Sequence, residues 1–156
     1  MARNKSELPD VPTRVSRSGK KEWLQDGKRH RDDGPAVTFK NGTRCWYQRG
    51  RLHREDGPAV DRADGCKKWY QDGKLHRKGE PALISPEENS MVQWWVKGLL
   101  HRIGGPAVSF STDLGVHQEW WENGVRHRKG APAVVHPGYE QWWNDGKPTR
   151  VEWVRK

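Results

Sequence analysis

The sequence predicts an all-β fold: an elongated, single-layer sheet of antiparallel β-hairpin repeats, about six repeats of 22–26 residues each. Three observations support this prediction. A tryptophan-led phrase recurs along most of the 156-residue chain. Each copy carries a turn dipeptide such as Asn-Gly or Asp-Gly, and these favour tight hairpins. No helical period extends beyond one turn, because Gly and Pro interrupt the chain throughout.

The composition is typical of a thin fold built from aromatic side chains. Only 32% of the residues are hydrophobic, a value common in disordered chains. The ten tryptophans oppose disorder, because each buried aromatic ring removes roughly 150–250 Å² from water. We expect a basic N-terminal tail at residues 1–10 and one repeat domain at residues 11–156.

Charge and cysteine content restrict the partners and the compartment. The formal net charge of +9 favours an anionic partner. No apolar run is long enough for a transmembrane helix, and the first 21 residues lack the apolar core of a secretion signal. The two cysteines, Cys45 and Cys66, form no disulfide framework, so we expect free thiols and a reducing, cytoplasmic setting.

Each repeat begins with a tryptophan, here called position n. An aromatic residue or Leu follows at n+1, Gly at n+4, His at n+7, Arg at n+8, and Pro-Ala with Val or Leu at n+12 to n+14. The phrase WYQDGKLHRKGEPAL from Trp69 shows the pattern. A leading half-repeat begins near Pro12, and the last copy has Thr149 in place of His. The six tryptophans at n are Trp23, Trp46, Trp69, Trp94, Trp120 and Trp142.

The turns predict how the strands pair. A two-residue loop at n+3 and n+4 places Trp n opposite the n+7 histidine, and n+1 opposite n+6. These histidines are His30, His53, His76, His101 and His127. A second two-residue turn between repeats, at Asn41-Gly42, places Val37 opposite Trp46. We therefore expect Val, Trp and His in one structural row on one face, with the Gly-Pro segment interrupting a strand.

The aromatic residue, the Asn-Gly turn, the histidine and the 23-residue period resemble the MORN repeat. The His-Gly of that family is His-Arg in this chain, as at His53-Arg54 and His76-Arg77, and Gly-Pro-Ala is added. The resemblance extends from about Pro12 to Trp153 and marks a divergent MORN-like variant, of a kind common in bacterial and viral genomes. It implies a curved single-layer sheet that acts as a membrane- or protein-binding scaffold.

The n+8 arginines and the n+1 aromatic residues form the candidate binding stripe. Alternation along a strand predicts that they share the face opposite the n tryptophans. Guanidinium and aromatic groups in alternation are typical of single-stranded nucleic acid binding. In the structural alternative each arginine lies over a neighbouring ring or pairs with a turn acid such as Asp33. The stripe comprises Arg31, Arg54, Arg77, Arg102, Arg128, Arg150, Tyr47, Tyr70, Trp95, Trp121 and Trp143.

Neither catalysis nor a cofactor is expected. Equivalent histidines lie on the order of 10 Å apart in adjacent repeats, whereas zinc ligands must converge on one ion. Each repeated histidine faces a tryptophan rather than a nucleophile. The off-register histidines are His117 and His136, and His117 with nearby Asp113 is the one acid–base candidate.

The sequence therefore predicts a non-enzymatic module that binds nucleic acid, either RNA or single strands. Two alternatives stay open. One is a protein–protein adaptor or inhibitor that uses the Trp-rich C-terminal half, where longer connections follow Ile84, Phe110 and Val135. The other is binding to an anionic membrane surface. Open sheet edges also leave homo-oligomers as an option.

Overall fold

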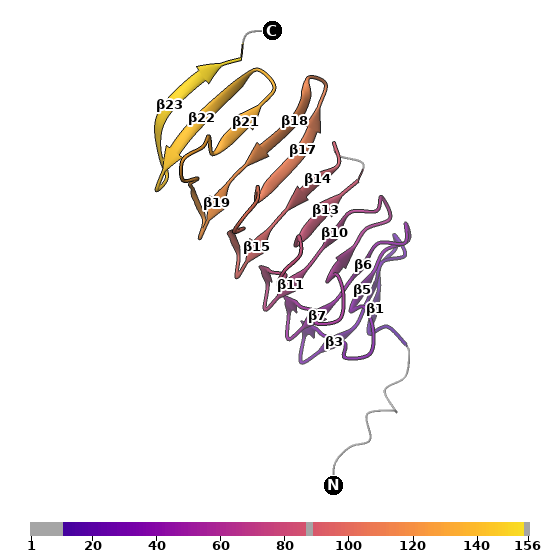
Figure 1. Ribbon diagram of the computed structural model, residues 1–156. Helices are drawn as coiled ribbons and strands as arrows, with labels where there is room; N and C mark the ends of the chain where they lie inside the picture. Colours follow the sequence, from indigo (N-terminus) through magenta and orange to yellow (C-terminus); the bar gives the residue numbers. More distant parts are fainter. Residues whose placement is uncertain (1–10, 87–88, 155–156) are drawn as a thin grey trace.

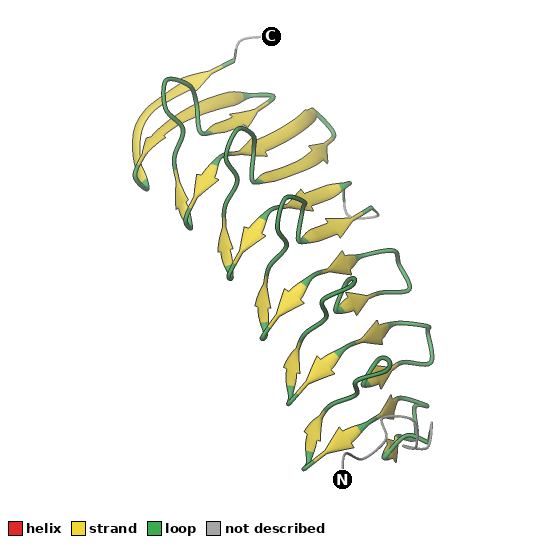
Figure 2. Ribbon diagram, turned by 60° about the horizontal axis from the view of Figure 1, so that its bottom comes forward, coloured by secondary structure: helices red, strands yellow, loops and turns green. Residues whose placement is uncertain are grey.

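The computed structural model describes residues 11–86 and 89–154, and its regular elements are β-strands in antiparallel hairpins (Figure 1). The predicted fold class is confirmed. The strands stack along one axis from the N-terminal to the C-terminal end, so the molecule is an open, elongated ribbon (Figures 1 and 2). The predicted tail at residues 1–10 lies outside the described residues. Within the described part, no helical segment suited to crossing a lipid bilayer is found.

Thirteen strands form one long main sheet, and each pairs with the main-sheet strands before and after it in the chain. These strands are β1 (Arg14–Val15), β2 (Lys21–Glu22), β5 (Val37–Thr38), β6 (Arg44–Cys45), β9 (Val60–Asp61), β10 (Lys67–Lys68), β13 (Leu83–Ser85), β14 (Met91–Gln93), β17 (Val108–Thr112), β18 (Gly115–Glu119), β21 (Val134–His136), β22 (Tyr139–Asn144) and β23 (Lys147–Trp153). The pairing of β1 with β2 confirms the leading half-repeat.

The remaining strands form five short hairpins beside the main sheet (Figure 2). Backbone hydrogen bonds join each hairpin to the next; for example, the N–H of Arg54 donates to the carbonyl of Tyr70 (3.1 Å) and that of Gly73 to the carbonyl of Leu52 (2.8 Å). The hairpins are β3 (Leu24–Gln25) with β4 (Lys28–Arg29), β7 (Tyr47–Gln48) with β8 (Arg51–Leu52), β11 (Tyr70–Gln71) with β12 (Lys74–Leu75), β15 (Trp95–Val96) with β16 (Leu99–Leu100), and β19 (Trp121–Glu122) with β20 (Val125–Arg126).

Pairing within each hairpin is as predicted. Tyr70 pairs with Leu75, and the N–H of His76 donates to the carbonyl of Trp69 (3.0 Å). Asp72 and Gly73 have φ values of 49° and 80°. Positive φ at both central residues is the geometry that a type I′ turn requires. The two-residue turn at n+3 and n+4 is therefore confirmed.

Between repeats, the predicted pairing is wrong by one residue. Val37 pairs with Cys45 rather than Trp46, and Val60 is likewise shifted away from Trp69. The N–H of Trp46 donates instead to the carbonyl of the n+13 alanine of its own repeat (2.8 Å). Valine at n+14 is therefore on the face opposite the Trp–His row.

In the first part of the chain the shift arises because the loops between main-sheet strands have three residues, at 17–19, 40–42 and 63–65, whereas the later loops at 113–114 and 137–138 have two. Phe39 and Thr43 are joined by a backbone hydrogen bond (2.9 Å), which leaves residues 40–42 as the loop. Gly42 has a φ of 89°, whereas Asn41 is outside the positive-φ region. A glycine in the left-handed conformation at the end of a three-residue loop is a common hairpin closure.

The Gly-Pro segment lies in a return loop that carries the chain from each hairpin back to the main sheet (Figure 2). The n+12 proline of each return loop thus lies outside the strands. The alanine that follows it is 0% exposed in all five complete repeats: Ala36, Ala59, Ala82, Ala107 and Ala133. No large side chain among the described residues is fully buried. The tightest packing therefore surrounds a row of alanines, flanked by half-buried tryptophans.

The last repeat differs from the others because β22 and β23 form one long hairpin with a bulge at Trp142 and Trp143. The hydroxyl of Thr149 donates to the carbonyl of Trp142 (3.2 Å). In earlier repeats this carbonyl accepts a hydrogen bond from the backbone N–H of n+7, so the Thr149 hydroxyl takes the place of that backbone donor.

Candidate functional site

Each repeat presents two different faces. The n tryptophan, the n+7 histidine, the n+8 arginine and the return loop lie on one side, here called the loop face. The side chains at n−1, n+1, n+6 and n+14 lie on the other side, here called the ladder face, because neighbouring residues alternate across a strand. The predicted binding residues divide between these two faces.

All six n+8 arginines lie over the n tryptophan of their own repeat. The distance from the guanidinium carbon to the ring centroid runs from 3.8 Å, for Arg128 over Trp120, to 4.6 Å, for Arg150 over Trp142. In four repeats the guanidinium also donates to the n+12 proline carbonyl, as Arg102 does to Pro106 (3.1 Å). This arrangement is the structural alternative raised from the sequence.

The prediction that these arginines share a face with the n+1 aromatic residues is wrong. Alternation holds only along a continuous strand, and in the five short hairpins the strand ends before the arginine. In the last repeat Arg150 lies within β23, next to the register shift at Trp142 and Trp143. The return loop then packs directly on the guanidinium. A Cβ added at Gly57 would lie 2.9 Å from Cζ of Arg54, and one at Gly105 would lie 2.8 Å from Cζ of Arg102. In these repeats the glycine before the proline lies directly against the guanidinium, whereas Glu80 and Ala131 stand at the equivalent position in the third and fifth repeats.

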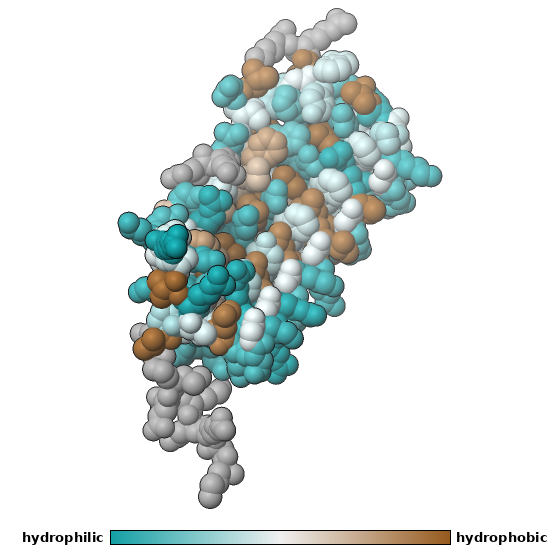
Figure 3. Space-filling model, turned by 180° about the vertical axis from the view of Figure 1, so that it is seen from behind, coloured by the Kyte–Doolittle hydropathy of each residue, from teal (hydrophilic) through white to brown (hydrophobic). Residues whose placement is uncertain are grey.

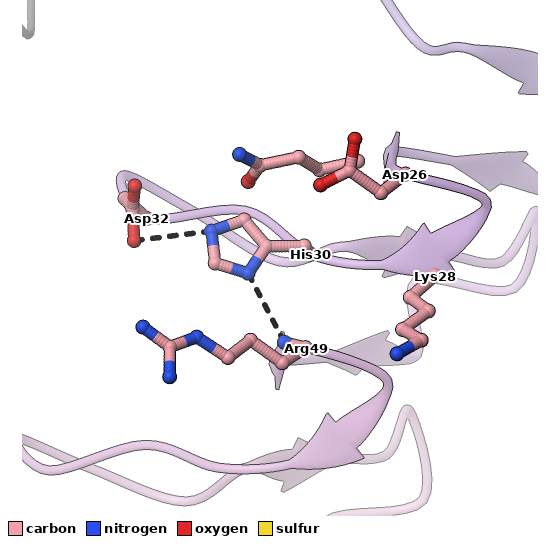
Figure 4. A pocket seen from close by; sticks show the side chains of 6 residues that line it. Asp26, Lys28, His30, Asp32 and Arg49 are labelled. Atoms are coloured by element: carbon pink, nitrogen blue, oxygen red, sulfur yellow. Dashed lines mark hydrogen bonds and ion pairs between the residues drawn. The ribbon is translucent and has the colours of Figure 1, made fainter.

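The n+7 histidines join each repeat to the next. Nδ1 of His101 accepts a hydrogen bond from the backbone N–H of Asn123 (3.1 Å), and the other four repeated histidines make the equivalent bond. Figure 4 shows this bond for His30 and Arg49, in a pocket where the second ring nitrogen of His30 faces Asp32 (3.3 Å). A neutral ring that accepts at Nδ1 carries its proton on Nε2. These histidines therefore act as structural acceptors.

The n+1 and n+6 side chains form a continuous row on the ladder face, here called the aromatic ladder. Arg126 lies between the rings of Trp121 (4.7 Å) and Trp143 (4.6 Å), so the n+6 group lies between the n+1 rings of adjacent repeats. Arg29 likewise lies over Tyr47 (5.4 Å). In chain order the ladder is Leu24, Arg29, Tyr47, Leu52, Tyr70, Leu75, Trp95, Leu100, Trp121, Arg126, Trp143 and Pro148.

Glutamate side chains at n−1 bind ladder residues in two of the repeats. Glu22 binds Arg29 through Nε (3.0 Å) and NH2 (2.8 Å). Glu119 accepts from the indole N–H of Trp121 (2.7 Å) and from Arg126 (2.9 Å). These two Glu–Arg pairs stand in the first and fifth repeats. The sequence reasoning missed them, although the same n−1 and n+6 residues occur together in both copies.

Gln93 and Gln141 bind the other two n+1 tryptophans. Each glutamine accepts a hydrogen bond from the indole N–H two residues later, at 3.0 Å for Trp95 and 3.1 Å for Trp143. The indole donors of the three n+1 tryptophans are therefore occupied within the fold, and their ring surfaces remain for contact with a partner.

Between the two Glu–Arg pairs, the ladder consists of Tyr47, Leu52, Tyr70, Leu75, Trp95 and Leu100, here called the central strip. All six side chains are half-buried. In the view of Figure 3, hydrophobic residues (brown) recur along the length of the molecule among more hydrophilic ones. Lys68 occupies n−1 in the middle repeat and is half-buried. Within residues 11–86 and 89–154, Lys68 has no hydrogen-bond or ion-pair partner among side chains.

A second row of rings crosses the C-terminal end of the main sheet, here called the terminal ring stack. Its ring centroids are spaced at 4.6, 5.7, 4.6 and 5.8 Å. His117 is 6% exposed, and its Nε2 lies 2.9 Å from Glu119 rather than beside Asp113. His117 and His136 thus belong to a packed row. In order, the stack is Phe110, His117, His136, Tyr139 and Trp153.

The two cysteines are buried free thiols, and burial raises the pKa of Cys45. In the described part of the chain, no group of three or more His, Cys, Asp or Glu side chains is arranged to hold a metal ion. Comparison with protein-family models finds no match for this chain, and comparison with curated proteins finds none either.

Glu119 should make stability depend on pH. Burial by itself raises the pKa of this carboxyl, but hydrogen bonds from His117, Arg126 and Trp121 outweigh burial and lower the pKa below its ordinary value of 4.5. The carboxylate therefore stabilises the fold above about pH 4.5, and this contribution is lost as the pH falls through the lower folded-state pKa. At pH 7, Glu119→Gln should lower the urea unfolding free energy by about 2 kcal/mol.

The difference between wild type and Glu119→Gln should shrink in titrations carried below pH 4.5. Glu122→Gln is the matched control, because Glu122 lies three residues later in β19, is exposed, and should change stability little at any pH. A stability difference that stays constant down to full protonation would contradict this role of the Glu119 carboxylate.

Proposed function

We propose that the protein is a non-enzymatic binding module that holds a segment of another protein on the central strip. The observation that supports this proposal is an apolar row over three repeats, half-buried and bordered by Lys68, which has no side-chain partner among the described residues. The return loops cover the other face only (Figure 2). A contiguous row of partly exposed apolar side chains is typical of an interaction site. The MORN-like resemblance also favours a scaffold role.

Lys68 indicates the chemistry of the partner. The n−1 side chains of four other repeats, Glu22, Gln93, Glu119 and Gln141, all bind ladder residues. Lys68 has no such partner in the described part of the chain. Covering an unpaired ammonium group with apolar surface is costly. A segment with apolar side chains and one carboxylate opposite Lys68 would remove this cost, so we expect an acidic, apolar peptide segment.

Nucleic acid is the second candidate, and one observation favours it. Lys28, Arg51 and Lys74 at n+5 form an exposed row, and none of them has an acidic partner among the described residues. Their stems pack against the n+4 glycine of the next repeat, as Lys28 does at Gly50, so their charged ends project outward. This row is on the face opposite the ladder rings. Charge and rings are thus separated, so the protein partner is the stronger proposal.

A double variant tests the central strip without disturbing the scaffold. Lys68→Glu with Leu75→Arg gives the third repeat the Glu–Arg pair that the first and fifth repeats already have. We expect thermal stability to be kept. Peptides selected on the wild type from a displayed random library should share apolar residues with Asp or Glu, and the best of them, once synthesised, should bind the double variant at least about tenfold more weakly.

The controls separate the two candidates. Lys67→Glu reverses an exposed charge on the loop face and should leave peptide binding unchanged. Peptides without acidic residues, or peptides that bind the double variant as well as the wild type, would contradict the proposal. Salt-sensitive binding of single-stranded oligonucleotides that needs Lys28, Arg51 and Lys74, and that the double variant keeps, would favour the second candidate.

A further inference from the structure

The main sheet ends at its C-terminal side in a long, uncovered edge strand. All seven residues of β23 are exposed, and in the part of the chain that the structure describes, this strand pairs with β22 alone. The other edge strand, β1, has only two residues. Trp153 is 76% exposed and Val151 is 48% exposed, both unusually high for large apolar side chains. A long exposed edge with apolar side chains is a template for pairing with another strand.

The hydrogen bonds to β22 determine which backbone groups of β23 face outward. The N–H of Val154 donates to the carbonyl of Gly138 (3.1 Å), and bonded and non-bonded pairs alternate along an antiparallel ladder. Arg150 and Glu152 therefore direct their backbone groups toward β22. Val151 and Trp153 direct theirs away from the sheet, where a partner strand can reach them.

The side chains of β23 are arranged for pairing with a copy of itself. Val151 and Trp153 share one face, where Trp153 ends the terminal ring stack 5.8 Å from Tyr139. Arg150 and Glu152 share the other face and form an ion pair. In an antiparallel pair centred on Val151, each Arg150 lies opposite Glu152 of the second copy.

We propose that the protein forms a two-fold symmetric dimer through antiparallel pairing of β23 with β23 of a second copy, centred on Val151. Charge selects this register. A shift by two residues places Arg150 opposite Arg150 or Glu152 opposite Glu152, and like charges directly opposite are unfavourable. A shift by one residue places Val151, whose backbone groups face outward, opposite Arg150, whose backbone groups face β22. The hydrogen bonds between the two copies then cannot form.

The dimer would join two main sheets into one continuous sheet and protect both long edges. Pro148 has no N–H to donate and ends the paired segment on its N-terminal side. The interface is closed by two-fold symmetry, so it produces dimers rather than filaments. This inference concerns β23 alone and is independent of the proposed partner at the central strip.

Complementary charge variants test the register. Arg150→Glu and Glu152→Arg each place like charges opposite each other in a self-pair, and each should dimerise at least about tenfold more weakly than the wild type. In an equimolar mixture, the two variants should form a heterodimer, because every facing pair is again of opposite charge. Sedimentation velocity over a wide concentration range, extending to high micromolar, measures the association of the wild type, of each variant and of the equimolar mixture.

The outcomes separate cleanly. A wild type that stays monomeric at every concentration, single variants that dimerise as well as the wild type, or growth beyond a dimer would each overturn the proposal. Arg150 also lies over Trp142, so circular dichroism checks that Arg150→Glu folds. If Arg150→Glu does not fold, Glu152→Arg alone still decides, because its side chain is 46% exposed and its weakened self-association is still required.

Discussion

Replacing Arg102 with alanine is expected to lower the free energy of unfolding by about 3 kcal/mol. Its guanidinium carbon lies 3.9 Å from the Trp94 ring centroid, and its NH1 group donates to the carbonyl of Pro106 (3.1 Å). The alanine variant removes the stacked cation and leaves the return loop without its support. Urea unfolding followed by circular dichroism measures the loss.

Two variants show whether the stacked guanidinium is the cause. Arg102→Lys keeps the charge but lacks the planar donor group, so it should recover less than half of the lost stability. Arg17→Ala removes an exposed arginine from the first inter-repeat loop and should change stability by no more than about 0.5 kcal/mol. Equal small effects of Arg102→Ala and Arg17→Ala would show that the n+8 arginines do not hold the repeats together.

Replacing Ala107 with leucine is expected to destabilise the protein by about 3 kcal/mol through overpacking. Ala107 is 0% exposed, and its backbone is held by the N–H of Trp94 (2.7 Å) and the carbonyl of Glu119 (2.8 Å). The main chain at this point cannot move away without losing both hydrogen bonds. Thermal and urea unfolding measure the change.

Ala63→Leu is the matched control for overpacking. Ala63 lies exposed in an inter-repeat loop, so the same added carbons meet solvent and should change stability by no more than about 0.5 kcal/mol. A fully stable Ala107→Leu protein would mean that the alanine row tolerates larger side chains, and that the buried alanines do not limit how closely the tryptophans and the main sheet approach.

The hairpins could be predicted because their information is local. Asp72-Gly73 and its equivalents determine a two-residue turn, and the turn determines the Trp–His pairing. Between repeats the same type of dipeptide was misleading. Asn41-Gly42 forms the end of a three-residue loop, whereas Asp72-Gly73 forms a complete two-residue turn. The sequence does not distinguish these two kinds of loop, because glycine is the last residue in both.

The face on which the n+8 arginines lie could not be predicted from the strand alone. Alternation along the strand predicts the wrong face for Arg54, because the chain leaves the strand and folds back over Trp46. The Gly-Pro pair that follows was the available signal, since it excludes a continuing central strand. The Glu–Arg pairs could have been found by comparing repeats, because Glu22 with Arg29 and Glu119 with Arg126 change together.

The bond from each n+7 histidine to the next turn makes every repeat depend on its immediate neighbours. An interior repeat is held from both sides, whereas a terminal one is held from a single side, as in other linear arrays. Fraying should therefore begin at the extremities and advance inward unit by unit. The same modularity allows whole repeats to be added by duplication or removed by deletion of the coding segment, so the length of the molecule can change while the contacts between repeats stay the same.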